Sequence, residues 1–136
     1  YGLLEACDML MEEGLENVFA RHERHAEATR RAVRSWGFEI QCSEPKEYSP
    51  VLTGVIMPTG HDADALRSVI LEKYNMSLGA GLGKIKGKVF RIGHLGDFND
   101  LMLMGTLSGV EMGLTSAGVP HDKGGAQAAL DFLAGN

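Results

Sequence analysis

The sequence predicts an α+β fold: a small sheet of three to four strands with helices packed on one face, preceded by one long helix. Apolar residues recur every three to four positions in several stretches, which indicates amphipathic helices. Short segments rich in β-branched residues lie between them, in the order long α, β, β, α, (β), β, α, α. Each helix has a single apolar stripe, so all of them can gather on one face of so small a sheet.

The first element is predicted to be one long helix from about Leu3 to Trp36, in which Gly14 could introduce a bend. Its second half alternates small or apolar positions with charged ones, as expected of a helix packed on one side only. Gly37 ends it. The 136-residue length is typical of a single domain. We expect residues 1–36 to form a linking helix and residues 37–136 to form the α+β body.

The middle of the chain begins with two predicted strands, Phe38–Gln41 and Leu52–Met57, separated by turn residues that include two prolines. Asp62 is suited to cap a helix over Ala63–Tyr74, because its carboxylate can accept from free backbone N–H groups of the first turn. Residues 75–78 are expected to form a short strand or a turn.

The last part contains the third clear strand, Lys88–His94, and a capped helix that begins after Gly96 and runs to about Ser116. A Gly-Val-Pro sequence stops that helix. A final, weaker helix is predicted over Gly125–Leu133.

Composition narrows the function classes. A formal charge of −5 argues against a general nucleic-acid binder, which needs a basic face. No apolar run approaches the length of a membrane span, and no signal peptide is recognisable, so no membrane partner is expected. Cys7 and Cys42 form no CxxC pair, which favours a reducing compartment and hence a cytoplasmic location.

The sequence does not match the standard motifs for phosphate binding or zinc binding. The glycine-rich segment would match a phosphate-binding Walker sequence only with glycine in place of Leu78 and Ser or Thr in place of Ile85. The pair His22 and His25 has the wrong spacing for a zinc helix, which needs the second histidine where Ala26 stands. We therefore predict no metal site and no catalytic residue in this chain.

Arg91 is the strongest candidate for a binding residue. It lies between Phe90 and Ile92 in a period-two segment, so its side chain points to the opposite face. The guanidinium is a rigid fork that matches a carboxylate or a phosphate. Gly81, Leu82 and Gly83 are expected to line the same site. The alternative is a surface salt bridge with a neighbouring acidic residue.

The N-terminus suggests a piece of a longer protein. Tyr1 and Gly2 lead at once into helical periodicity, without an initiator methionine or a capping residue. In a detached piece we expect apolar surface without neighbours at Trp36, at Phe38 and at the end of the long helix.

Three parts of the sequence resemble a known family: Gly14–Asn17 with Arg21-His22, Val55–Gly60, and Leu82–Gly96 with its core Gly87-Lys88-Val89-Phe90-Arg91-Ile92-Gly93. The chain is similar to the C-terminal small domain of class V, fold-type-I aminotransferases, above all those that use serine or alanine with glyoxylate. The resemblance implies a pyridoxal-phosphate enzyme, normally a homodimer, that transfers an amino group between an amino acid and a 2-oxo acid. It also implies that Arg91 binds the substrate α-carboxylate.

The chain departs from that family in one respect. The Schiff-base lysine and the aspartate at the pyridine nitrogen belong to the family's large domain, upstream of the long helix, and this chain does not contain that domain. None of its lysines occupies the motif of the Schiff-base lysine: Lys46, Lys73, Lys84, Lys86, Lys88 and Lys123. We therefore expect no covalently bound cofactor here, and no transamination by this chain alone.

Two alternatives stay open from the sequence. One is a free-standing α+β module that binds a small carboxylate through Arg91 or serves dimerisation. The other is the small domain of a related cysteine desulfurase or phosphoserine aminotransferase.

Overall fold

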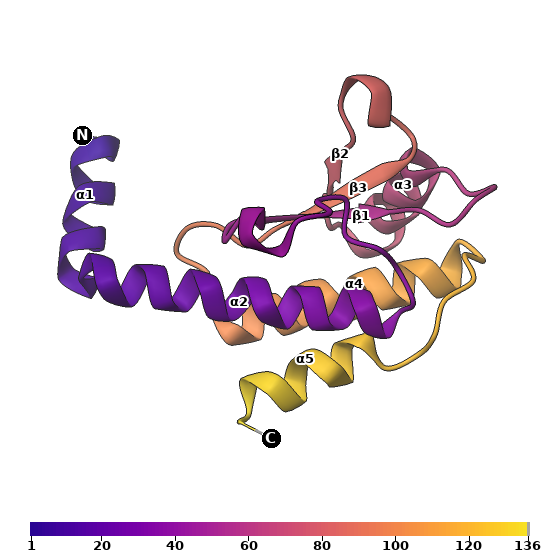
Figure 1. Cartoon of the computed structure of the whole chain (residues 1–136). Coiled ribbons are helices and arrows are strands. Elements are labelled where there is room, and N and C mark those ends of the chain that lie inside the picture. Colours follow the sequence, from indigo (N-terminus) through magenta and orange to yellow (C-terminus); the bar gives the residue numbers. More distant parts are fainter. Residues whose placement is uncertain (136) are drawn as a thin grey trace.

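The computed structural model describes residues 1–135 and shows the predicted α+β fold, a three-stranded antiparallel sheet with helices against it (Figure 1). Two short 3-10 turns, Pro45–Glu47 and Gly83–Ile85, lie in the connections. The helices and strands are α1 (Gly2–Glu13), α2 (Leu15–Ser35), β1 (Leu52–Ile56), α3 (Ala63–Tyr74), β2 (Gly79–Ala80), β3 (Val89–Gly93), α4 (Asp100–Ser116) and α5 (Gly125–Leu133).

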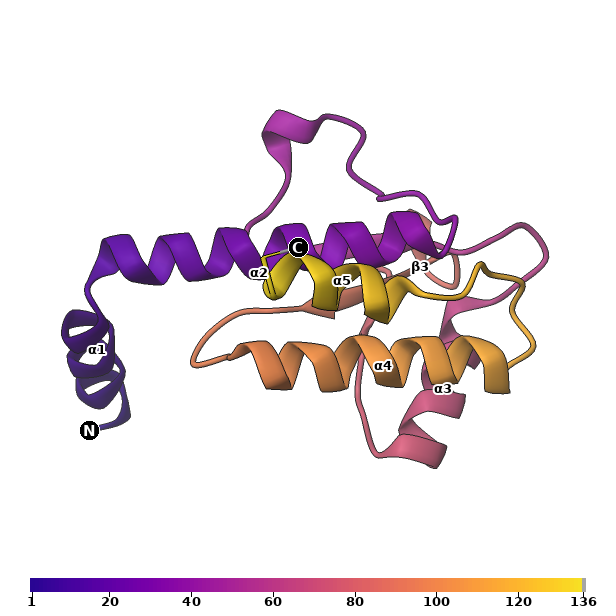
Figure 2. The same ribbon diagram turned by 90° about the horizontal axis from the view of Figure 1, so that it is seen from below.

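The long helix predicted for the N-terminus is divided into two, because Gly14, the residue at which we expected a bend, breaks it. Gly14 has φ 83° and ψ 130°, a conformation that lies outside the helical region and that glycine adopts without a steric penalty. As a result α1 turns sharply away from the start of α2 (Figures 1 and 2). Arg21 of α2 fixes this corner: its Nε donates to Glu13 at 2.6 Å and its Nη1 donates to the carbonyl of Gly96 at 2.8 Å.

The sheet has the order β1-β3-β2, with β3 in the centre. The strand predicted over residues 38–41 is wrong. Only an isolated bridge between Ile40 and Val55 forms there, because the chain leaves the edge of β1 for the turn at Pro45–Glu47. Residues 75–78, expected to form a short strand or a turn, contain no strand, and the short β2 lies just after them.

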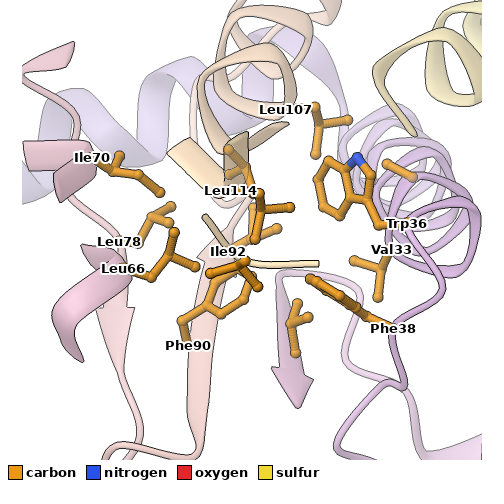
Figure 3. Packing of buried hydrophobic residues seen from close by; sticks show 14 of the residues in the cluster. Val33, Trp36, Phe38, Leu66, Ile70, Leu78, Phe90, Ile92, Leu107 and Leu114 are labelled. Carbon is orange, nitrogen blue, oxygen red and sulfur yellow. The ribbon is translucent and has the colours of Figure 1, made fainter. Parts of the chain in front are cut away.

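The core lies between one face of the sheet and the helices. Phe90 and Ile92 of β3 are fully buried and point toward Leu66 and Ile70 of α3, and toward the α4 residue Leu114 (Figure 3). α5 lies along α2 and also packs on α4 (Figures 1 and 2). The predicted packing of helices on one face is therefore confirmed.

Two aromatic residues that we expected to be short of neighbours belong to this core. Trp36 is 1% exposed and Phe38 is 8% exposed. The apolar surface lies instead on α1, which has no buried residue and exposes Leu3 and Met11. Glu111 of α4 and Gly125 of α5 lie against Trp36, whereas α1 projects away from the domain (Figure 1).

A hydrogen-bonded cluster joins α2, α4 and α5. Trp36 donates from Nε1 to Oε2 of Glu111 at 3.0 Å, and the backbone N–H groups of Ala126 and Gly124 donate to the same carboxylate at 2.9 and 2.8 Å. Burial acts to raise the pKa of Glu111, but these hydrogen bonds outweigh it and hold the pKa below its usual value.

No helix among residues 1–135 is long and apolar enough to cross a membrane.

The close approach of α5 to Trp36 predicts a cost for Gly125→Ala. A Cβ at position 125 would lie 2.2 Å from Nε1 of Trp36, so α5 or the indole must shift. We expect unfolding free energy to fall by roughly 1–3 kcal/mol, measured by urea denaturation. Gly105→Ala is the matched control, because its Cβ would meet nothing within 4 Å on α4. That variant should be neutral or slightly more stable; equal effects of the two substitutions would contradict the prediction.

Candidate functional site

Arg91 occupies the middle of the central strand, on the face opposite the core. In the antiparallel register it pairs with Gly54 of β1 on one side and with Gly79 of β2 on the other. Its strand neighbours Phe90 and Ile92 are fully buried, while Arg91 itself is half-buried. The predicted alternation is therefore confirmed, and the arginine is flanked on its own face by two residues without side chains.

The guanidinium of Arg91 is held at one nitrogen only. Its Nε donates to the carbonyl of Ala80 at 2.7 Å. None of the ion pairs within residues 1–135 involves Arg91, and its two terminal nitrogens donate to no group in that range. The surface salt bridge considered as an alternative is thus not formed among these residues, and the fork remains available for an anion.

A cavity of about 160 Å³ adjoins Arg91. Sequence reasoning missed most of its lining, because the connection before β1 brings Gln41 and Tyr48 over this face of the sheet. Arg30 of α2 also lines the cavity, but it pairs with Glu27 at 3.1 Å and lies 5.2 Å from the centre of the Tyr48 ring. Of the two arginines, Arg91 is the one without a carboxylate partner in residues 1–135.

The predicted lining residues Gly81, Leu82 and Gly83 follow β2 directly. A Cβ at Gly81 would lie 2.3 Å from the carbonyl oxygen of Ile85, so this glycine is required for the turn itself. Gly83 has φ 55° and begins the 3-10 turn, and Leu82 is 66% exposed. The N–H of Gly81 donates to the carbonyl of Val89, on the strand that holds Arg91, at 2.9 Å. The role of these three residues in lining a site stays a prediction.

His94 ends the same strand but belongs to the opposite, buried face. Its Nδ1 lies 3.1 Å from the carbonyl of Pro50, which can only accept, so Nδ1 carries the proton. Its Nε2 then accepts from the hydroxyl of Thr53 at 3.0 Å. Burial lowers the pKa of His94 to about 4, so the ring is neutral at physiological pH.

The histidines of α2 serve packing contacts. His25 is fully buried and its Nε2 lies 2.9 Å from Asp100, which also receives two hydrogen bonds from Arg24. The hydrogen bond from Arg24 is the main reason that the pKa of Asp100 lies below its usual value. His22 bonds the backbone of Val18 and Gly96. Within residues 1–135, no three His, Cys, Asp or Glu side chains are grouped to hold a metal ion.

The buried neutral His94 predicts a stability change between pH 7 and pH 4. The unfolded chain binds a proton near pH 6.5, whereas the folded chain resists it until about pH 4. The contribution of neutral His94 to the free energy of unfolding is therefore fully present above pH 6.5. It is lost as the pH drops from 6.5 to about 4, by up to about 1.4 kcal/mol per pH unit. Urea denaturation at several pH values measures it. In His94→Gln the pH dependence that His94 contributes to the free energy of unfolding should vanish, whatever the stability of the variant at pH 7. An unchanged pH dependence would contradict the conclusion that His94 is buried in its neutral form.

Comparison with known proteins identifies the family. No protein-family model matches the chain. The chain is 46% identical over its whole length to serine–glyoxylate aminotransferase of Methylorubrum extorquens, and 48% identical over 98% of its length to that of Arabidopsis thaliana. It spans only 34% and 33% of these two relatives.

A solved structure agrees with these relatives. Pyridoxamine–pyruvate aminotransferase from Mesorhizobium loti superposes with a TM-score of 0.87 at 32% identity, over 93% of this chain and 33% of that one. The chain therefore belongs to the class V aminotransferases, and its α+β fold is that of their small domain.

Proposed function

We propose that this chain is the small domain of a pyridoxal-phosphate enzyme that transfers an amino group from serine or alanine to glyoxylate, and that Arg91 binds the substrate α-carboxylate. One observation supports the role of Arg91 above all. Its Nε is fixed to Ala80 on the central strand, while its terminal nitrogens have no carboxylate partner within residues 1–135. The relatives act on glyoxylate by name, which favours this reaction over cysteine desulfuration or phosphoserine transamination.

The contribution of Arg91 to such a reaction is binding and orientation. Two parallel hydrogen bonds to a carboxylate define both the position and the plane of the amino acid, which a single point charge does not. With the carboxylate fixed, rotation of the substrate is restricted and its amine is presented in one direction. In the complete enzyme, pyridoxal phosphate would supply the aldehyde that accepts the amino group.

The lysines of this chain do not fit the role of covalent anchor for that cofactor. All of them are exposed to solvent. A lysine that forms a Schiff base at neutral pH needs its pKa lowered by burial or by neighbouring cations. We therefore propose that the lysine and the catalytic groups lie in the large domain, in the part of the protein that the relatives have beyond this third of their length.

We further propose that α1 contacts that large domain or a second subunit of a homodimer. A groove of about 910 Å³ runs between α1, α2 and the loop at Leu95. Met9, Leu10 and Phe19 of its lining are each at least 40% exposed. Apolar surface of this kind is typical of a protein interface.

The unpaired thiols of Cys7 and Cys42 are consistent with a cytoplasmic enzyme.

Substitution of Arg91 tests the proposed function in the full-length protein. Arg91→Gln should raise KM for serine by about 10- to 100-fold, since a charge-assisted pair is worth roughly 1.5–3 kcal/mol. The KM of Arg91→Lys should lie between those of the wild type and Arg91→Gln, because lysine keeps the positive charge but lacks the planar guanidinium. Steady-state kinetics with glyoxylate measure both, and Lys73→Gln on the surface of α3 is the control. The proposal would be refuted if the wild-type protein did not catalyse serine–glyoxylate transamination, or if Arg91→Gln left KM unchanged.

The absence of a suitable lysine is tested with the 136-residue chain itself. After incubation with pyridoxal phosphate and reduction with borohydride, mass spectrometry should find only weak, scattered labelling of the exposed lysines. The full-length protein should give a one-to-one adduct under the same conditions. A one-to-one adduct at a single lysine of the short chain would show that the anchor lies here.

A further inference from the structure

We infer that Gly79 positions the guanidinium of Arg91, so that the absence of a side chain at residue 79 determines how well the arginine meets a substrate carboxylate. The inference rests on the proposed function of Arg91 as the carboxylate-binding residue. It assigns the positioning role to an edge strand of two residues, β2, which the sequence alone marks only as part of a glycine-rich segment.

The two glycines that flank Arg91 in the sheet are not equivalent. A Cβ at Gly54 would meet Gln41 at 3.2 Å and Val89 at 3.7 Å, and no atom of Arg91 is among its nearest contacts. The three atoms nearest to a Cβ at Gly79 would all belong to Arg91: its Cβ at 3.0 Å, its Nε at 3.1 Å and its Cζ at 3.5 Å. The arginine side chain therefore lies over Gly79 and not over Gly54.

The backbone of β2 completes the arrangement. The carbonyl of Ala80 accepts from Nε of Arg91 at 2.7 Å, which uses one of the five N–H donors of the guanidinium. The remaining four belong to the two terminal nitrogens and can serve a bidentate ligand. Because Gly79 has no side chain, the guanidinium can lie close enough to the strand to make the bond to Ala80.

A methyl group at residue 79 would disturb this geometry directly. Contacts of 3.0 and 3.1 Å are closer than carbon and nitrogen atoms normally approach, so the side chain of Arg91 would move by a few tenths of an ångström or lose its bond to Ala80. The charge would remain, but the fork would no longer be held in one place. Small displacements of a positioning group weaken substrate binding severalfold, since an error of about 1 Å costs roughly 100-fold.

The test is the kinetics of Gly79→Ala in the full-length protein with cofactor bound. We expect KM for serine to rise about five- to tenfold, because a fork that is no longer held in one place binds the carboxylate less tightly. Gly105→Ala, whose Cβ would meet nothing within 4 Å, should leave KM unchanged. A wild-type KM in Gly79→Ala would overturn the inference.

A double-mutant cycle with Arg91→Lys separates positioning from a general structural effect. Lysine has no Nε–H donor and a flexible stem, so Gly79→Ala should add less than twofold to KM in the Arg91→Lys background. Equal effects in both backgrounds, or loss of folding of Gly79→Ala in both, would show a purely structural role and overturn the inference. If Arg91→Gln leaves KM unchanged, the proposed function itself fails, whereas a large effect of Arg91→Gln with none of Gly79→Ala refutes only the role of Gly79.

Discussion

The alternation of side chains along β3 is the constraint on which the rest of the structure depends. Phe90 and Ile92 enter the core on one face, and Arg91 stands on the other between two glycines. A slip of the strand by one residue would bury the guanidinium and expose both apolar side chains, which is strongly unfavourable. The burial that stabilises the domain therefore also determines where its charged residue points.

The helices that cover this strand are joined to one another through contacts distant in sequence. Glu111 of α4 binds Trp36 at the end of α2 and the first turn of α5. In the middle of α2, Arg24 and His25 bind Asp100 at the start of α4. Both carboxylates have a lowered pKa because their hydrogen bonds favour the charged form. Together the two clusters hold α2, α4 and α5 against one another.

The proposed site and the proposed interface lie on parts of the molecule that are held in place to different degrees. Arg91 is carried by the central strand and held by the edge strand β2, so its position needs no ligand to define it. α1, by contrast, has no buried residue and is tied to α2 and the loop at Gly96 mainly through Arg21. This arrangement suits a domain that supplies one preorganised carboxylate-binding residue and offers its apolar N-terminal helix to another part of the enzyme.

The sequence by itself determined the fold class, the helices α3 and α5 to the residue, and the outward direction of Arg91, because these follow from local periodicity and capping. The sequence marked Gly14 as a point where the helix could bend, and the structure decided that the helix breaks there into two. The structure also decided that residues 38–41 form an isolated bridge to β1 and no strand. Tertiary structure also placed Gly79 beneath the guanidinium, because sheet register joins residues that no local pattern relates.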